Sequence, residues 1–154
     1  FDMYIRLVDL SKGQGRLYLG KYYSDEIVDC LMRDDLSVFM TDAWVEAAGT
    51  QNGAAFQGFP YFFVRAREHG IPVESVVHKM TGKTAERFGI RERGLLKEGY
   101  FADITVFDPE RMKVDPAAPD FSPEGIVHVL VNGRFAVRDG VYCAERAGHL
   151  LLKK

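Results

Sequence analysis

The sequence predicts a chain of two parts, an α/β part over residues 1–93 and a β-rich part over residues 94–154. In the first part, apolar residues recur at helical spacing on both sides of one short apolar run. In the second part the pattern changes to short strand-like runs. The Asn132-Gly133 pair between two of these runs is a strong signal for a tight hairpin turn. A chain of 154 residues is long enough to bury a core.

The α/β part is expected to contain helices and short strands. Ser24 is a good N-cap for a helix over residues 25–34. A second helix is expected to begin near Pro60 and to end at Gly70, after a loop over residues 46–58. Two more helices are predicted over residues 73–80 and 84–88. The predicted strands of this part are residues 3–8 and the apolar run 36–40.

The β-rich part is expected to form a set of short strands joined by tight turns. Asp139-Gly140 is a second turn signal after Asn132-Gly133. Residues 108–125 hold four of the six prolines and are predicted to be an extended loop. The predicted strands cover residues 102–107, 126–131, 135–137 and 141–143.

Composition excludes several classes of protein. The net charge of −2 gives no reason to expect binding to nucleic acid or to an anionic membrane. No apolar run approaches the ~20 residues that a membrane-spanning helix needs. The two cysteines, Cys30 and Cys143, match no metal or redox spacing, so we expect reduced thiols in a cytoplasmic protein.

Asp42 is the best candidate for a functional side chain. It comes directly after the apolar run 36–40 and Thr41, where a predicted buried strand ends. In parallel barrels, catalytic groups lie at such strand ends. A carboxylate there can bind a metal or transfer a proton. The structural alternative is that Asp42 caps the following turn, and residue spacing alone leaves both interpretations open.

The remaining polar residues predict no second site. The four histidines, at positions 69, 78, 128 and 149, show no spacing that would bring two imidazoles together on one strand or helix. Asp103 lies inside a predicted strand, and we interpret it as a structural residue bound to nearby backbone or to an arginine. The basic residues between Arg65 and Arg93 alternate with glutamates, which is typical of a solvated helical face.

Three segments together resemble a known family. They are the run Val38-Phe39-Met40-Thr41-Asp42-Ala43, the stretch Gly99-Tyr100-Phe101-Ala102-Asp103-Ile104-Thr105-Val106-Phe107-Asp108-Pro109, and Val129-Leu130-Val131-Asn132-Gly133-Arg134. In this order they resemble the closing third of a metal-dependent amidohydrolase, and most closely the D-aminoacylase (N-acyl-D-amino-acid deacylase) group. The similarity runs from about Leu36 to the C-terminus. One departure is Thr41, where relatives usually have serine.

The resemblance implies a (β/α)₈ barrel with a small β-sandwich. Residues 1–93 would then be the C-terminal end of the barrel, with its last strand at residues 38–41, and residues 94–154 would belong to the sandwich. It also implies that Asp42 contacts the catalytic metal, zinc, and carries a proton from the attacking water to the departing amine. Most metal ligands would precede Phe1, so the chain is expected to be the tail of a larger enzyme that acts on a small-molecule amide.

Three functions are open at this point. The first is hydrolysis of a linear amide such as an N-acyl-D-amino acid. The second keeps the family but takes a cyclic amide, as dihydroorotase-like and hydantoinase-like enzymes do. The third is a β-rich binding or assembly module without catalysis. In each case a lone strand over residues 36–41 would have two unpaired edges. We therefore expect it to pair with strands from a missing chain, from a partner in a homo-oligomer, or from a rearranged fold.

Overall fold

The computed structural model describes residues 1–12, 23–45, 47, 52–118 and 120–152. The chain forms two compact units, residues 1–30 and 31–154. In the first unit, helix α1 (Asp2–Leu10) occupies the place of the strand predicted over residues 3–8, and that prediction is wrong. Met3, Leu7 and Leu10 are spaced four and three residues apart, which is helical periodicity. No residue of α1 is buried.

The predicted helices are confirmed, with one difference. Helix α2 (Asp25–Arg33) is followed by α3 (Ala54–Glu68), α4 (Val73–Met80) and α5 (Gly82–Phe88). Helix α3 begins well before Pro60, so the loop prediction is wrong for residues 54–58, whereas residues 46 and 48–51 lie outside the described part. Just before the helix, the Asn52 side chain accepts a hydrogen bond from the N–H of Ala54, the first helical residue, at 2.9 Å.

Glycines end two of the helices. Gly70 has a left-handed φ of 62°, and the N–H of Ile71 donates to the Ala66 carbonyl at 2.8 Å. This is the Schellman arrangement, which glycine favours because it has no Cβ. Gly89 after α5 has a φ of 68°. The ends of α3 and α5 therefore lie where the sequence predicts them.

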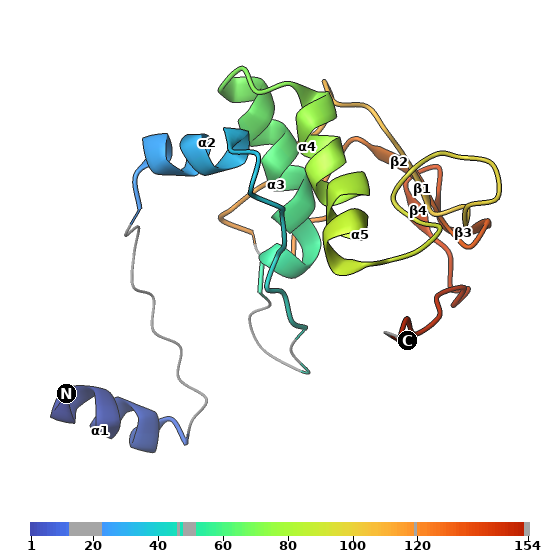
Figure 1. Ribbon diagram of the computed structural model, residues 1–154. Helices are drawn as coiled ribbons and strands as arrows, with labels where there is room; N and C mark the ends of the chain where they lie inside the picture. Colours follow the sequence, from blue (N-terminus) through green and yellow to red (C-terminus); the bar gives the residue numbers. More distant parts are fainter. Residues whose placement is uncertain (13–22, 46, 48–51, 119, 153–154) are drawn as a thin grey trace. The chain divides into compact units, whose positions relative to one another are not determined.

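The second half of the chain forms an antiparallel sheet of four strands in the order β1-β2-β3-β4 (Figure 1). The strands are β1 (Ile104–Phe107), β2 (Ile126–Val131), β3 (Arg134–Arg138) and β4 (Val141–Tyr142). Asn132 and Gly133 between β2 and β3 have φ values of 50° and 78°. Two positive φ values define the primed turn that matches the twist of a hairpin. Asp139 and Gly140, with φ values of 52° and 75°, repeat it.

Side chains of α3 hold the loop between β1 and β2 against the helix. The Gln57 amide donates to the carbonyls of Asp115 and Ala118 at 3.0 and 2.7 Å, and accepts from the Asp115 N–H at 2.6 Å. Arg67 donates to the carbonyls of Pro109 and Glu110, both at 2.9 Å. The ring of Phe63 lies 4.7 Å from that of Phe107 in β1. Because these contacts run along the helix, α3 positions both the loop and the sheet.

The core of the second unit is small and lies around α3 and α4. Met32, Val76 and Met112 are its largest fully buried side chains. The run 36–40 does not form the predicted strand, because no described strand pairs with it. Its sides differ nevertheless, since Phe39 is 8% exposed whereas Leu36 and Met40 are 93% and 69% exposed. Among the described residues, no helix is both long and apolar enough to cross a bilayer.

Exchanging Gln57 for glutamate tests the attachment of the loop to α3. Gln57→Glu removes two donors and turns a buried carboxylate toward two carbonyl oxygens, so we expect the free energy of unfolding to fall by about 3 kcal/mol. Hydrogen exchange should become faster in residues 113–118. The matched control is Glu68→Gln at an exposed position of the same helix. An unfolding free energy within about 0.5 kcal/mol of wild type would contradict this role.

Candidate active site

The segment that leads to Asp42 is fixed at its start by a buried lysine. Lys79 of α4 is only 2% exposed. Its ammonium donates to the Met32 carbonyl at 2.8 Å, to the Ser37 hydroxyl at 2.7 Å and to the Asp34 carbonyl. These bonds satisfy carbonyls that neither a helix nor a sheet pairs. We call residues 34–42 the Asp42 segment.

Burial has a clear electrostatic effect on Lys79. Removal from water lowers the pKa of this ammonium, and the neighbouring Lys83 acts in the same direction against the carboxylates of Asp35 and Asp34. The prediction of a solvated basic face is therefore wrong for Lys79, and also for Arg65, which is 5% exposed. Lys79 lies three residues after the fully buried Val76, and this helical spacing was the signal that could have placed it inside.

The middle of the Asp42 segment packs on α3. The ring of Phe39 stacks on Phe62, with centroids 4.4 Å apart and planes 10° from parallel. The Lys79 ammonium lies 5.7 Å from the centroid of the same Phe39 ring. Stacked rings and a nearby cation both stabilise this arrangement. The segment is therefore held in place without the ladder hydrogen bonds of a strand.

Asp42 is the last residue of this segment. Its side chain is exposed, and its backbone has a φ of 48°. A positive φ is uncommon for residues other than glycine, although aspartate tolerates it better than most. The left-handed residue follows the run 36–41, and its exposed side chain leaves a carboxylate at the surface. Such a carboxylate can accept a proton or contribute one oxygen to a metal.

The described residues do not make a metal site by themselves. Within them, no three side chains of His, Cys, Asp or Glu gather closely enough to hold a metal ion. His128 accepts a hydrogen bond from the Asp139 N–H at 3.1 Å, and its ring lies edge-on to Phe135 at 5.6 Å. His78 is exposed on α4. Asp42 would therefore need ligands from beyond these residues to take part in a metal centre.

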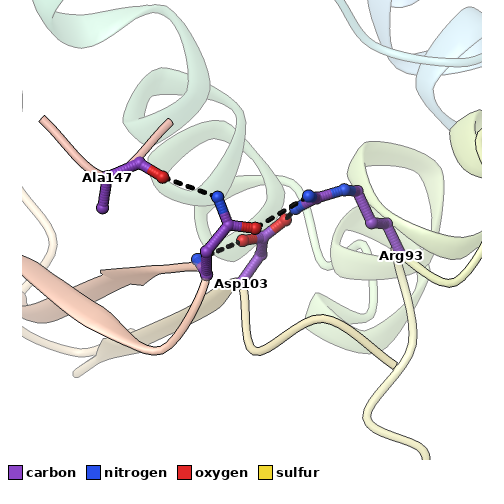
Figure 2. A network of polar contacts seen from close by, with 4 residues as sticks. Arg93, Asp103 and Ala147 are labelled. Atoms are coloured by element: carbon purple, nitrogen blue, oxygen red, sulfur yellow. Dashed lines mark hydrogen bonds and ion pairs between the residues drawn. The ribbon is translucent and has the colours of Figure 1, made fainter. Parts of the chain in front are cut away.

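Asp103 is bound in the way that the sequence predicts, to backbone and to an arginine. Its carboxylate accepts from the Asn132 N–H at 2.8 Å and forms an ion pair with Arg93 (Figure 2). Arg93 also donates to the Asn132 side-chain oxygen at 2.8 Å, and the Asn132 amide donates to the Ala147 carbonyl at 2.6 Å. These contacts join the start of β1, the β2–β3 turn and the C-terminal tail. Asp103 is thus a structural residue.

The network changes the acidity of Asp103. Partial burial by itself would raise the pKa of this carboxyl group. The Asn132 N–H and the Arg93 guanidinium outweigh that effect, so the pKa of Asp103 lies below its usual value. A carboxyl group with a lowered pKa in the folded state stabilises the fold above its unfolded pKa. This stabilisation is lost as the pH falls.

Comparison with known proteins identifies the class of the chain. The sequence profile of the amidohydrolase family matches residues 22–137. The chain therefore belongs to the amidohydrolase family.

Deacylases are among the relatives of the chain, together with allantoinases. A D-aminoacylase from Alcaligenes xylosoxydans xylosoxydans is 42% identical over 92 residues, which are 57% of this chain and 19% of the relative. An N-acyl-D-aspartate deacylase from the same organism is 46% identical over 85 residues, 53% of this chain and 17% of the relative.

A solved D-aminoacylase, described for the role of its binuclear metal centre, has a TM-score of 0.55 at 38% identity. That match covers 58% of this chain and 20% of the D-aminoacylase. The chain spans about a fifth of the length of these relatives.

Acid should weaken the Asp103 network. Asp103→Asn removes the ion pair with Arg93, and we expect the free energy of unfolding at neutral pH to fall by about 2 kcal/mol. The difference from wild type should shrink as the pH falls below 3.8, the unperturbed value for this carboxyl group. Chemical denaturation at a series of pH values, with exposed Asp120→Asn as the control, measures it. A difference that stays constant through acid pH would contradict the lowered pKa.

Proposed function

We propose that this chain is the C-terminal part of a metal-dependent amidohydrolase that hydrolyses a linear amide, namely an N-acyl-D-amino acid. The observation that carries the proposal is family membership over residues 22–137 together with 42% and 46% identity to two deacylases of N-acyl-D-amino acids. In this proposal residues 1–93 complete the barrel, with its last strand at residues 38–41. Residues 94–154 contribute to a β-sandwich.

Asp42 is the residue to which we assign the proton transfer. Hydrolysis of an amide forms a bond between water oxygen and the carbonyl carbon, breaks the C–N bond, and moves a proton from the water to the amine nitrogen. A carboxylate at the end of the Asp42 segment is suited to take that proton and to deliver it to the leaving nitrogen. The left-handed backbone and the exposed side chain of Asp42 support this assignment.

We further propose zinc as the cofactor. Because the described residues lack a set of three ligands, most ligands would come from the part of the relatives that this chain does not span. Asp42 would supply one contact. Zinc is the metal given by the resemblance to D-aminoacylases, and the binuclear metal centre of the solved D-aminoacylase supports a metal in general.

Residues 36–41 are where we propose that the other strands of the barrel pair with this chain. Leu36 and Met40 are strongly exposed, and the run pairs with no described strand. A segment of backbone that lacks strand partners and exposes apolar side chains is a template for pairing. We propose that barrel strands pair here, with a homo-oligomer partner as the alternative. The free thiols of Cys30 and Cys143 support a cytoplasmic location.

The first test is the intact mass of the protein from its native source, detected through its C-terminus. We expect a mass above 17.4 kDa by at least the roughly 200 residues of a barrel. A mass of 17.4 kDa would leave Asp42 without a set of ligands, since the described residues hold no group of three that could bind a metal. The catalytic proposal would then give way to a non-catalytic binding or assembly module.

The second test is activity of the intact protein that contains this chain. Purified with zinc, it should hydrolyse N-acetyl-D-amino acids faster than the L-enantiomers or cyclic amides, and a chelator should abolish the reaction. Asp42→Asn should lower kcat by a factor of about 10² to 10⁴, because it removes the proton carrier. The control is Asp120→Asn, which should keep wild-type kcat. Preference for a cyclic amide would replace the substrate assignment, and an active Asp42→Asn protein would refute the role of Asp42.

A further inference from the structure

Gly58 is a glycine inside helix α3 whose presence the helix itself does not explain. Glycine weakens a helix interior compared with alanine. Its φ is not among the positive ones, so the backbone does not require the conformational freedom of glycine. A reason must therefore be sought in what lies against it.

The neighbour that excludes a side chain at position 58 is Thr41. A Cβ added to Gly58 would lie 2.5 Å from the Thr41 Cγ2 and 3.0 Å from the Thr41 Cβ. Separations below 3.0 Å essentially never occur for real Cβ atoms. Around Gly148, by contrast, an added Cβ would meet nothing within 4 Å. The hydrogen of Gly58 is thus what lets the Asp42 segment approach α3 so closely.

This contact is made by the residue directly before Asp42. The segment is attached earlier at four residues. Lys79 binds Asp34 and Ser37, Lys83 binds the Asp35 carbonyl, and the ring of Phe62 stacks on Phe39. Thr41 on Gly58 is the last attachment before the chain turns through the left-handed φ of Asp42. A methyl group at position 58 would push Thr41 away by about 1 Å, and a misplacement of that size in a catalytic group can lower a rate about 10²-fold.

We propose that Gly58 is a positioning residue for Asp42: its lack of a side chain lets Thr41 lie against α3, and the seated Thr41 sets where the Asp42 carboxylate lies. The inference rests on the proposed function, because it takes Asp42 to be the proton carrier. It extends that function by assigning a role to a residue that contacts neither substrate nor metal.

The test is a double-mutant cycle between positions 58 and 41 in the intact protein. Gly58→Ala should lower kcat for an N-acetyl-D-amino acid by about 10- to 100-fold and change KM much less, because proton transfer is disturbed more than binding. Circular dichroism should show no loss of helix, since alanine favours helices. The matched control is Gly148→Ala, which should keep wild-type kcat and KM.

Thr41→Ser provides the rescue, because it deletes the Cγ2 methyl that lies nearest to the added Cβ. In the Thr41→Ser background, Gly58→Ala should lower kcat less than threefold, a strongly non-additive cycle. An equal loss of kcat in both backgrounds, or wild-type kcat in Gly58→Ala alone, would overturn the inference. If Gly58→Ala lowered kcat through a general packing defect, the Thr41→Ser exchange would not restore kcat.

If Gly58→Ala does not fold, the double variant with Thr41→Ser and Gly58→Ala tests the contact instead. A folded double variant with at least a third of the kcat of Thr41→Ser supports the contact. A folded but inactive double variant, or an unfolded one, overturns it. The underlying function fails separately: an inactive wild-type protein, or an active Asp42→Asn protein, would remove both proposals. An active wild type with an inactive Asp42→Asn and an unaffected Gly58→Ala would remove only this one.

Discussion

The structure depends on the need to satisfy backbone carbonyls in two irregular segments, residues 34–42 and 108–125. Neither segment has a sheet or a helix to pair most of these groups, and a buried unpaired carbonyl is costly. Long polar side chains of α3 and α4 bind carbonyls of both segments instead. Gln57 and Arg67 hold the segment 108–125, and Lys79 holds the segment 34–42 at the Asp34 carbonyl. Helices with few buried apolar residues thereby fix the position of long stretches of chain.

The same constraint separates the structural acid from the candidate catalytic one. Asp103 forms an ion pair with Arg93 and accepts a hydrogen bond from the Asn132 N–H, so both oxygens of its carboxylate already have partners. Asp42 ends a segment that is held through other residues, among them Asp34, Ser37, Phe39 and Thr41. A carboxylate that is placed by packing and left exposed keeps its oxygens available. The two acids look alike in sequence, and their partners distinguish them.

The sequence predicted correctly those features that depend only on a residue and its immediate neighbours, such as tight turns and helix C-termini. Asn132-Gly133 and Asp139-Gly140 form the predicted turns, because positive φ is a property of the residue and its immediate neighbours. Gly70 ends α3 for the same reason. The run 36–40 forms no strand in the described part of the chain, because a strand requires partner strands and no described strand pairs with it. Its pairing with strands from elsewhere stays a prediction. The strand predicted over residues 3–8 was wrong, because a run of six residues can fit the period of a strand as well as that of a helix.

The sequence by itself determined the two hairpin turns, the C-terminal ends of α3 and α5 and the resemblance to amidohydrolases, since each follows from short-range chemistry or from motif order. Only the tertiary structure decided that Lys79 is buried and that Gln57 holds a loop some sixty residues away. It also decided that Gly58 lies against Thr41. These are contacts between segments distant in sequence, and no local pattern encodes which carbonyl or methyl group a side chain will meet after folding.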